Sequence, residues 1–589
     1  MRLASLWALA LLAPGVSAAQ TPPVAAEPLQ MPPFLVEEQK GDGIEWSYGS
    51  SADIRVLSGC GAGETAAFLR QAIDQRDELR KFIPGEFLLH ESLPPTLVIF
   101  PRSQKQAMDR VVETELTKGA AASSRHFAPM NDLRLSDPDS SDIFIVFDDN
   151  ASSTQIWLRD GDRVSSMSNQ TPVLSPSYVR FLLQARAPAL PDWYVSGCVG
   201  LYETMDFKPA GDPGAGTYDT GRLGTTAVGF EPEPWLSDTA APALRRHPDG
   251  ARPLIPMREL LAARYPFAKS DEYRRVWEAQ AELFVRWALS GRVDGGQERL
   301  RRLVEGASTQ RTTEEFFYAC FGIDYADALD ALSDYLPYAV GKPLRVPADA
   351  GLRAAPPELH AATAAEVRRV KSEWSRRVLW AIKEDNPGAF PLFAGKVRDS
   401  LEGAFARGER DPDFVASLAL FRIMYGKPDD GIRLLEQFPA AAATRPVAQL
   451  VLAQQHLQVA LANPSGAKGK LGEEQASRLL REIIPPAPAS PLESAYALAA
   501  RVCEHLGRDP TPSERAILVD GARLFPRNAD LVVQAAAWEL RAGEVRDAES
   551  LVEFGLWESA DPAARRNLVA LDNLARQALT VASVQGRSR

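Results

Sequence analysis

The sequence has few cysteines and no excess of positive charge, and each shortage excludes a class of protein. Its 589 residues include four cysteines and no C-x-x-C pair, so the chain is neither a disulfide scaffold nor a zinc knuckle. Acidic residues (77) outnumber lysine and arginine (66), and the net charge of −11 argues against a nucleic-acid partner. No apolar run reaches the ~20 residues that cross a bilayer, so we expect no transmembrane segment.

Histidine is also scarce, and its distribution excludes one common metal motif. A His-Glu-x-x-His helix places two imidazoles one turn apart, where both reach the same zinc ion. No two of the six histidines stand four residues apart: His90, His126, His247, His360, His456 and His505. The widely spaced cysteines can be buried thiols or form disulfides, and the spacing does not choose between them: Cys60, Cys198, Cys320 and Cys503.

The first 42 residues predict an exported protein. Residues 1–19 combine a positive start at Arg2, an apolar run and a small-residue end, as in a cleavable signal peptide. Residues 20–42 are rich in proline, alanine and glutamate and predict a disordered leader. We therefore expect the mature chain in the periplasm of a bacterium or outside the cell.

Residues 43–341 alternate strand and helix signals, which predicts an α+β domain. Chain length suggests about two to four domains in all. The expected strands are two around a Gly-Ser turn at 44–58, then 96–100, 142–149 and 154–160. Apolar residues at three- and four-residue steps predict helices at 64–82, 276–291, 296–306, 312–322 and 325–340, and residues 208–226 predict an irregular loop.

A proline-rich linker at 342–357 should separate this domain from an all-helical region at 358–589. From about residue 360 nothing in the sequence predicts a strand. Two stretches resemble the tetratricopeptide helix hairpin: Gly426 and Gly431 occupy the turn and crossing positions in one, Gly543 and Ala548 in the other. The resemblance implies a helical-repeat array that binds proteins, and a non-repeating helical domain is the alternative.

One stretch, residues 176–203, resembles the peptidase MA-like (gluzincin) superfamily. Pro191 and Trp193 match its Pro-x-Trp element, Gly197 stands where glycine follows the glutamate ligand, and Tyr202 closes the motif. The resemblance implies a zincin-like fold for residues 43–341, with a mixed sheet and helices. It also implies a zinc site on two facing helices.

The residues that would bind zinc are replaced. Counted back from Trp193, Pro176 and Arg180 stand at the histidine positions, Ser177 at the catalytic glutamate and Ser196 at the glutamate ligand. Proline has no donor, and a guanidinium repels a dication. Neither serine has a histidine or lysine nearby in sequence, so a serine nucleophile is not favoured. We expect no catalytic residues, no metal and no cofactor.

Three nearby residues could still line a cleft: Trp193, Tyr194 and Glu203. Core packing is the more common role for such aromatic residues, and a solvated helix face for such a glutamate.

The sequence therefore predicts an exported, non-catalytic binding or scaffold protein, in which an inactivated zinc-peptidase-like domain precedes a helical protein-interaction region. Its partner is an unknown protein or peptide. One alternative is an active hydrolase with an unrecognised or rebuilt site. Another is a periplasmic assembly factor whose helices contact an envelope complex.

Overall fold

The computed structural model describes most of the chain between residues 44 and 587. The described ranges are 44–51, 54–88, 96–100, 132–135, 143–147, 154–160, 163–169, 176–184, 186–206, 226–228, 254–262, 271–341, 344–346, 357–385, 387–388, 390–463, 466–484, 491–505, 509–558 and 562–587. The expected signal peptide (1–19), the expected leader (20–42) and all but the last residue of the expected loop (208–226) lie outside them.

A six-stranded mixed sheet with the order β11-β1-β2-β3-β5-β4 organises the first part of the chain. β1 (Ser47–Ser50) and β2 (Arg55–Ser58) form an antiparallel hairpin, as the sequence predicts. β3 (Thr96–Phe100) runs parallel to β2, and β5 (Ile143–Phe147) runs parallel to β3. β4 (Asp132–Leu135) closes the far edge against β5.

The remaining strand of this sheet comes from beyond residue 341. β11 (His360–Ala361) pairs with β1 in antiparallel register, Ser47 opposite Ala361. The expectation of no strand from about residue 360 is therefore wrong at these two residues. The dipeptide is a strand because it completes the open edge of β1, a backbone interaction that side-chain preference does not reveal.

Two smaller sheets lie outside the main one. β6 (Thr154–Asp160) and β7 (Arg163–Asn169) form an antiparallel pair. β8 (Met205–Asp206), β9 (Thr226–Val228) and β10 (Leu344–Val346) form the other. β10 lies inside the proline-rich segment 342–357, so part of that segment is paired to the first part of the chain.

Helices share the first core with side chains from one face of the main sheet. They are α1 (Ala62–Leu79), the short 3-10 helix Gly85–Phe87, α3 (Pro176–Gln184), α4 (Asp192–Glu203), α6 (Met257–Leu260), α7 (Asp271–Leu289), α8 (Gly296–Ala307), α9 (Glu314–Phe321) and α10 (Tyr325–Gly341). Thr313 caps α9, the helix expected at 312–322: its hydroxyl accepts a hydrogen bond from the Phe316 amide at 3.2 Å.

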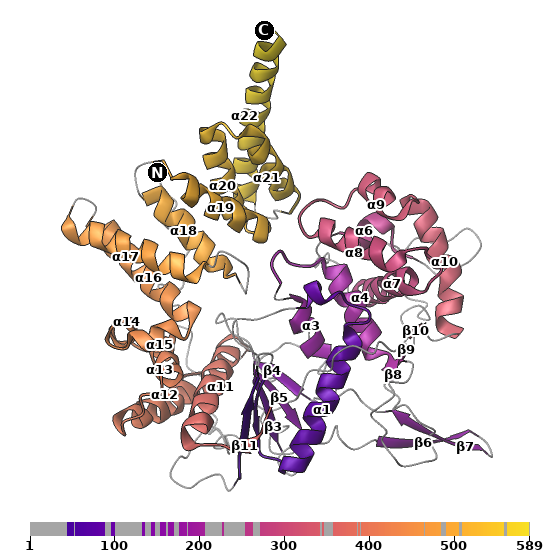
Figure 1. The fold of residues 1–589 in the computed structure, drawn as a ribbon, viewed down its shortest axis with the longest axis horizontal. Coiled ribbons are helices and arrows are strands. Elements are labelled where there is room, and N and C mark those ends of the chain that lie inside the picture. Colours follow the sequence, from indigo (N-terminus) through magenta and orange to yellow (C-terminus); the bar gives the residue numbers. More distant parts are fainter. Residues whose placement is uncertain are drawn as a thin grey trace, which may run out of the picture.

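The rest of the described chain is helical. Its helices are α11 (Ala364–Asp385), α12 (Phe390–Ala406), α13 (Pro412–Tyr425), α14 (Pro428–Gln437), α15 (Pro439–Ala443), α16 (Pro446–Ala462), α17 (Ala467–Ile483), α18 (Glu493–His505), α19 (Pro512–Leu524), α20 (Ala529–Ala542), α21 (Val545–Glu558) and α22 (Pro562–Arg587). In Figure 1 these orange-to-yellow helices form a curved row that begins beside the sheet and ends with α22. We refer to α11–α22 as the array.

The array packs on the second face of the sheet. Successive residues of a strand point to opposite faces, and the two cores divide the strands in this way. Val56 and Leu97 belong to the core with α1, α3 and α4, whereas Leu57 and Val98 belong to the core with α11–α13. The sheet is therefore a middle layer, and the array shares a core with it.

Small residues bring paired helices of the array together, as the sequence predicts. A Cβ on Gly431 of α14 would lie 2.5 Å from the carbonyl oxygen of Ala419 in α13, so only glycine fits this crossing. Ala548 of α21 is fully buried, and Gly543 ends α20 in the left-handed conformation. The array is thus built from repeat-like helix hairpins.

The structure also shows the state of the cysteines and the apolar character of the helices. All four cysteines are buried free thiols: Cys60, Cys198, Cys320 and Cys503. Among the helices in the described ranges, none has the length and apolar character required to span a bilayer.

Candidate functional site

The stretch that resembles a zinc-peptidase motif forms two contacting helices, α3 and α4, at the centre of the first part of the chain (Figure 1). Pro191 stands at the N-cap of α4, where its restricted backbone directs the chain into the helix. α4 in turn lies along α7. The two helices are therefore held on a third one, and α7 contributes residues to their surroundings.

Glycines set how closely α4 approaches α7. A Cβ on Gly197 would lie 2.7 Å from the carbonyl oxygen of Ala281, and one on Gly200 would lie 2.8 Å from Oε2 of Glu282. Neither distance is compatible with an alanine in the present packing. Gly197, singled out in the sequence as part of the motif, thus has a structural function in helix crossing.

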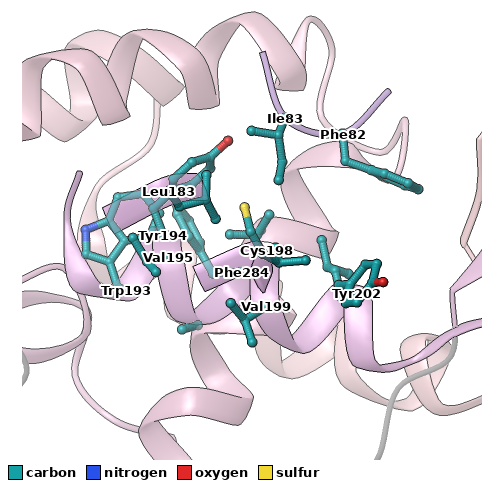
Figure 2. Close-up of a cluster of buried hydrophobic side chains, with 14 of the residues drawn as sticks. Phe82, Ile83, Leu183, Trp193, Tyr194, Val195, Cys198, Val199, Tyr202 and Phe284 are labelled. Atoms are coloured by element: carbon teal, nitrogen blue, oxygen red, sulfur yellow. The ribbon is translucent and has the colours of Figure 1, made fainter. Parts of the chain in front are cut away.

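The aromatic residues of the motif are buried. Trp193 is 0% and Tyr194 1% exposed, and Tyr202 is equally enclosed (Figure 2). Trp193 meets Phe284 of α7 edge-on, with ring centroids 5.4 Å apart, and Tyr194 meets Phe87 edge-on at 5.6 Å. Trp193 and Tyr194 therefore pack in the core and do not line a cleft.

Tyr194 also approaches Cys198 one turn later, and burial keeps both groups neutral. Burial raises the pKa of Cys198 to about 12, although its hydrogen bond with Tyr194 acts in the opposite direction. The pKa of Tyr194 is raised well above its ordinary value, first by burial and then by Cys198. A thiol with so high a pKa is not a nucleophile at neutral pH, so this pair is part of the core.

The four positions that correspond to zinc ligands and base lie on α3 and α4. Pro176 begins α3, Ser177 follows it, and Arg180 is half-buried on the same helix. Ser196 of α4 is 8% exposed. Helices α3 and α4 contact each other, which brings these positions to one region of the molecule.

The charge of Arg180 acts on a carboxylate that the sequence did not indicate, Glu278 of α7. Burial raises the pKa of Glu278, and the charges of Arg180, Arg274 and Arg275 lower it, Arg180 most strongly of the three. The region thus contains a positive charge at a position that corresponds to a ligand in the resemblance, together with a carboxylate from α7 on which that charge acts. No local pattern marks Glu278, because it looks like any charged residue of an amphipathic helix.

The residues at these positions do not fit a zinc ion. Proline offers no side-chain donor, and the Arg180 guanidinium opposes a dication at short range. Among the residues that the structure describes, no group of three or more histidine, cysteine, aspartate or glutamate side chains is arranged to hold a metal ion.

Glu203, the third possible cleft residue, is exposed at the end of α4. The hydroxyl of the following residue, Thr204, lies 3.4 Å from Oε1 of Glu282 on α7 and 3.1 Å from the carbonyl oxygen of Gly200, and can donate its proton to either. The Glu282 contact links the C-terminus of α4 to α7, while Glu203 stays at the surface.

A second polar cluster, also missed by the sequence analysis, lies where the array meets the sheet. Glu373 of α11 is 6% exposed, and three guanidiniums approach it: Arg445 at 2.9 Å, Arg376 at 3.1 Å and Arg377 at 3.8 Å. Burial opposes ionisation, but these arginines lower the pKa of Glu373 to about 2. In sequence, Glu373, Arg376 and Arg377 have the spacing of a solvated helix face, so nothing indicated burial.

Comparisons of the chain with protein-family models, with curated proteins and with solved structures find no match.

Proposed function

We propose that this chain is an exported, non-catalytic binding or scaffold protein. Its first part would be a peptidase MA-like (gluzincin) domain of zincin-like fold whose zinc motif is degenerate. Its array would be a tetratricopeptide-like region that binds a protein or peptide partner. The charge of Arg180 at one of the ligand positions, which lowers the pKa of the Glu278 carboxyl, carries the first half of this proposal. A fixed positive charge can take the place of a metal ion, and a guanidinium is no Lewis acid.

The array supports the second half. Stacked helix hairpins offer extended surfaces for partners, and close crossings such as that at Gly431 keep such a surface rigid. Two of its leucines are largely exposed on helices that pair with each other, Leu461 of α16 (42%) and Leu471 of α17 (53%). We place a contact with the partner at these two side chains.

Metal analysis tests the non-catalytic half. Protein purified without chelators should contain far less than one zinc per chain and should not hydrolyse casein or unstructured peptides. About one zinc per chain, removable by a chelator with loss of stability, would instead favour a hydrolase with a rebuilt site.

Crosslinking in intact cells of the source organism tests the binding half. We expect the Leu461→Gln/Leu471→Gln variant to lose a specific crosslinked partner while retaining its helical circular dichroism. The matched control is Tyr318→Gln, which removes an exposed aromatic side chain (58%) from α9, outside the array. Equal recovery of all partners by both variants would contradict a binding role for this part of the array. N-terminal sequencing of the same protein would show whether residues 1–19 are removed.

A further inference from the structure

A small pocket lies at the junction of the sheet and the array. Arg55 of β2 and Thr96 of β3, which are opposite each other in the parallel register, line it from the sheet. Arg369, Glu373 and Arg377 line it from α11, and Arg445, which precedes α16, completes it. The pocket is separate from α3 and α4, and nothing in the proposed function uses it.

Its lining consists mainly of hydrogen-bond donors. A guanidinium offers five N–H groups and no acceptor, and four guanidiniums border this pocket together with one hydroxyl and one carboxylate. The carboxylate, Glu373, already faces Arg445 and Arg376 at 2.9 and 3.1 Å. Nearby, Asp413 lies 3.8 Å from both Arg369 and Arg445.

A positive charge of the sheet and a positive charge of the array repel each other at the pocket. The pKa of Arg55 is lowered, first by burial and then by the charge of Arg445; Tyr48, Asp413 and Glu373 act in the other direction. Arg55 belongs to the sheet and Arg445 to the array. An anion between the two would attract both and so strengthen the junction.

We propose that this pocket binds a single small anion of the size of chloride, held by Arg55, Arg377, Arg445 and the hydroxyl of Thr96. The volume of the pocket, about 10 Å³, favours a monatomic over a polyatomic ion, because it accommodates a body about as large as a water molecule and chloride is only somewhat larger. A sulfate or phosphate ion, with four oxygens around a central atom, would require the lining side chains to move. The bound ion would act as a bridge between the sheet and the array.

Thermal unfolding of the full chain at fixed ionic strength tests the proposal, with gluconate replacing chloride. Raising chloride from about 5 to about 200 mM should raise Tm by about 1–2 °C, because a ligand that binds only the folded state stabilises it by mass action, by at most about 2 kcal/mol for this concentration ratio. Sulfate at equal ionic strength should raise Tm by less. In crystals grown in bromide, an anomalous scattering peak should lie between Arg55 and Arg445.

Two variants and one control assign the effect to the pocket. Arg55→Met should abolish the chloride-dependent part of the Tm shift, and Thr96→Val, a smaller change, should reduce it. Arg433→Met removes an exposed guanidinium of α14 and should keep the full shift. The proposal is wrong if wild-type Tm does not depend on chloride at fixed ionic strength, or if all three variants keep the same shift. A larger effect of sulfate than of chloride would overturn the assignment by size.

Discussion

Gly197 of α4 lies against Ala281 of α7 so closely that a Cβ on the glycine would be 2.7 Å from the alanine carbonyl oxygen. The same Cβ would meet Cγ2 of Val285 at 2.7 Å. Backbone and a packed side chain both block the position, so α4 must shift if any side chain is added. The glycine that the sequence marks as a motif residue is thus required for the packing of three central helices.

Gly197→Ala should therefore destabilise the first part of the chain, by about 1–3 kcal/mol if α4 and α7 separate only slightly. Differential scanning calorimetry of the full chain measures the change. The control is Gly63→Ala in the first turn of α1, where a Cβ has no atom within 4 Å and alanine is the better helix former. Equal Tm values for the two variants would show that the crossing tolerates a methyl group.

Glu373 should give the junction a pH dependence. A glutamate in an unfolded chain titrates near pH ~4.3, and the arginines lower the pKa of Glu373 to about 2 in the folded protein. A lowered folded-state pKa contributes stability that is complete above about pH 4.3 and is lost as the pH falls towards the folded value. We expect Tm to fall across this range partly because Glu373 becomes protonated.

Glu373→Gln should remove that part of the pH dependence and lower stability at pH 7 by about 3 kcal/mol or more, because buried guanidiniums lose their counter-charge. Thermal unfolding from pH 7 to about pH 2.5 measures both effects. Glu436→Gln, which changes an exposed residue of α14, is the control and should match the wild type. A Glu373→Gln curve parallel to the wild-type curve at every pH would contradict the assignment.

Restoring the four motif positions tests the proposed ancestry. The quadruple variant carries Pro176→His, Ser177→Glu, Arg180→His and Ser196→Glu. It places side chains of the kinds that bind zinc on two contacting helices and removes a competing positive charge. We expect it to gain zinc affinity without hydrolytic activity, because residues that orient the histidines and stabilise a transition state are not restored. The buried position of Ser196 should also cost stability when a glutamate replaces it.

Isothermal titration with zinc, compared with the unmodified chain, measures the gain. A variant that keeps Ser196 but carries the other three changes should bind more weakly. Negligible binding by both variants, with circular dichroism unchanged, would mean that these positions do not converge. The resemblance argued from Pro191, Trp193 and Gly197 would then lose its main support.

The junction between the sheet and the array should also be detectable with fragments of the protein. Limited proteolysis is expected to cut within 342–357 or 208–226, and a fragment from about residue 358 should be helical. Because the sheet and the array share a core, separately produced fragments 44–346 and 358–589 should associate. Gel filtration of the mixture measures this. A strong strand signal in the second fragment, or no association between two folded fragments, would contradict the prediction.

Several elements could be predicted from the sequence because their causes are local. β3 has the predicted bounds because five strand-forming residues follow two prolines. Thr313 caps α9 and Gly426 follows the end of α13, since caps and helix ends depend on residues within one turn. α3 and α4 are the two helices that the resemblance implied for residues 176–203.

Other features required the fold. β11 is a strand because β1 has an open edge, which lies more than 300 residues earlier in the chain. The charge of Arg180 on α3 acts on Glu278 of α7 because both helices pack on α4, and no pattern in the sequence of these helices records that packing. The sequence by itself determined the order and type of most elements, the exchanged residues of the zinc-peptidase-like motif and the small residues of the helix crossings. Only the tertiary structure decided which charges act on one another, such as those of Arg55 and Arg445 at the junction. Electrostatic interactions depend on distances in space, and the spacing of residues along the chain does not encode those distances.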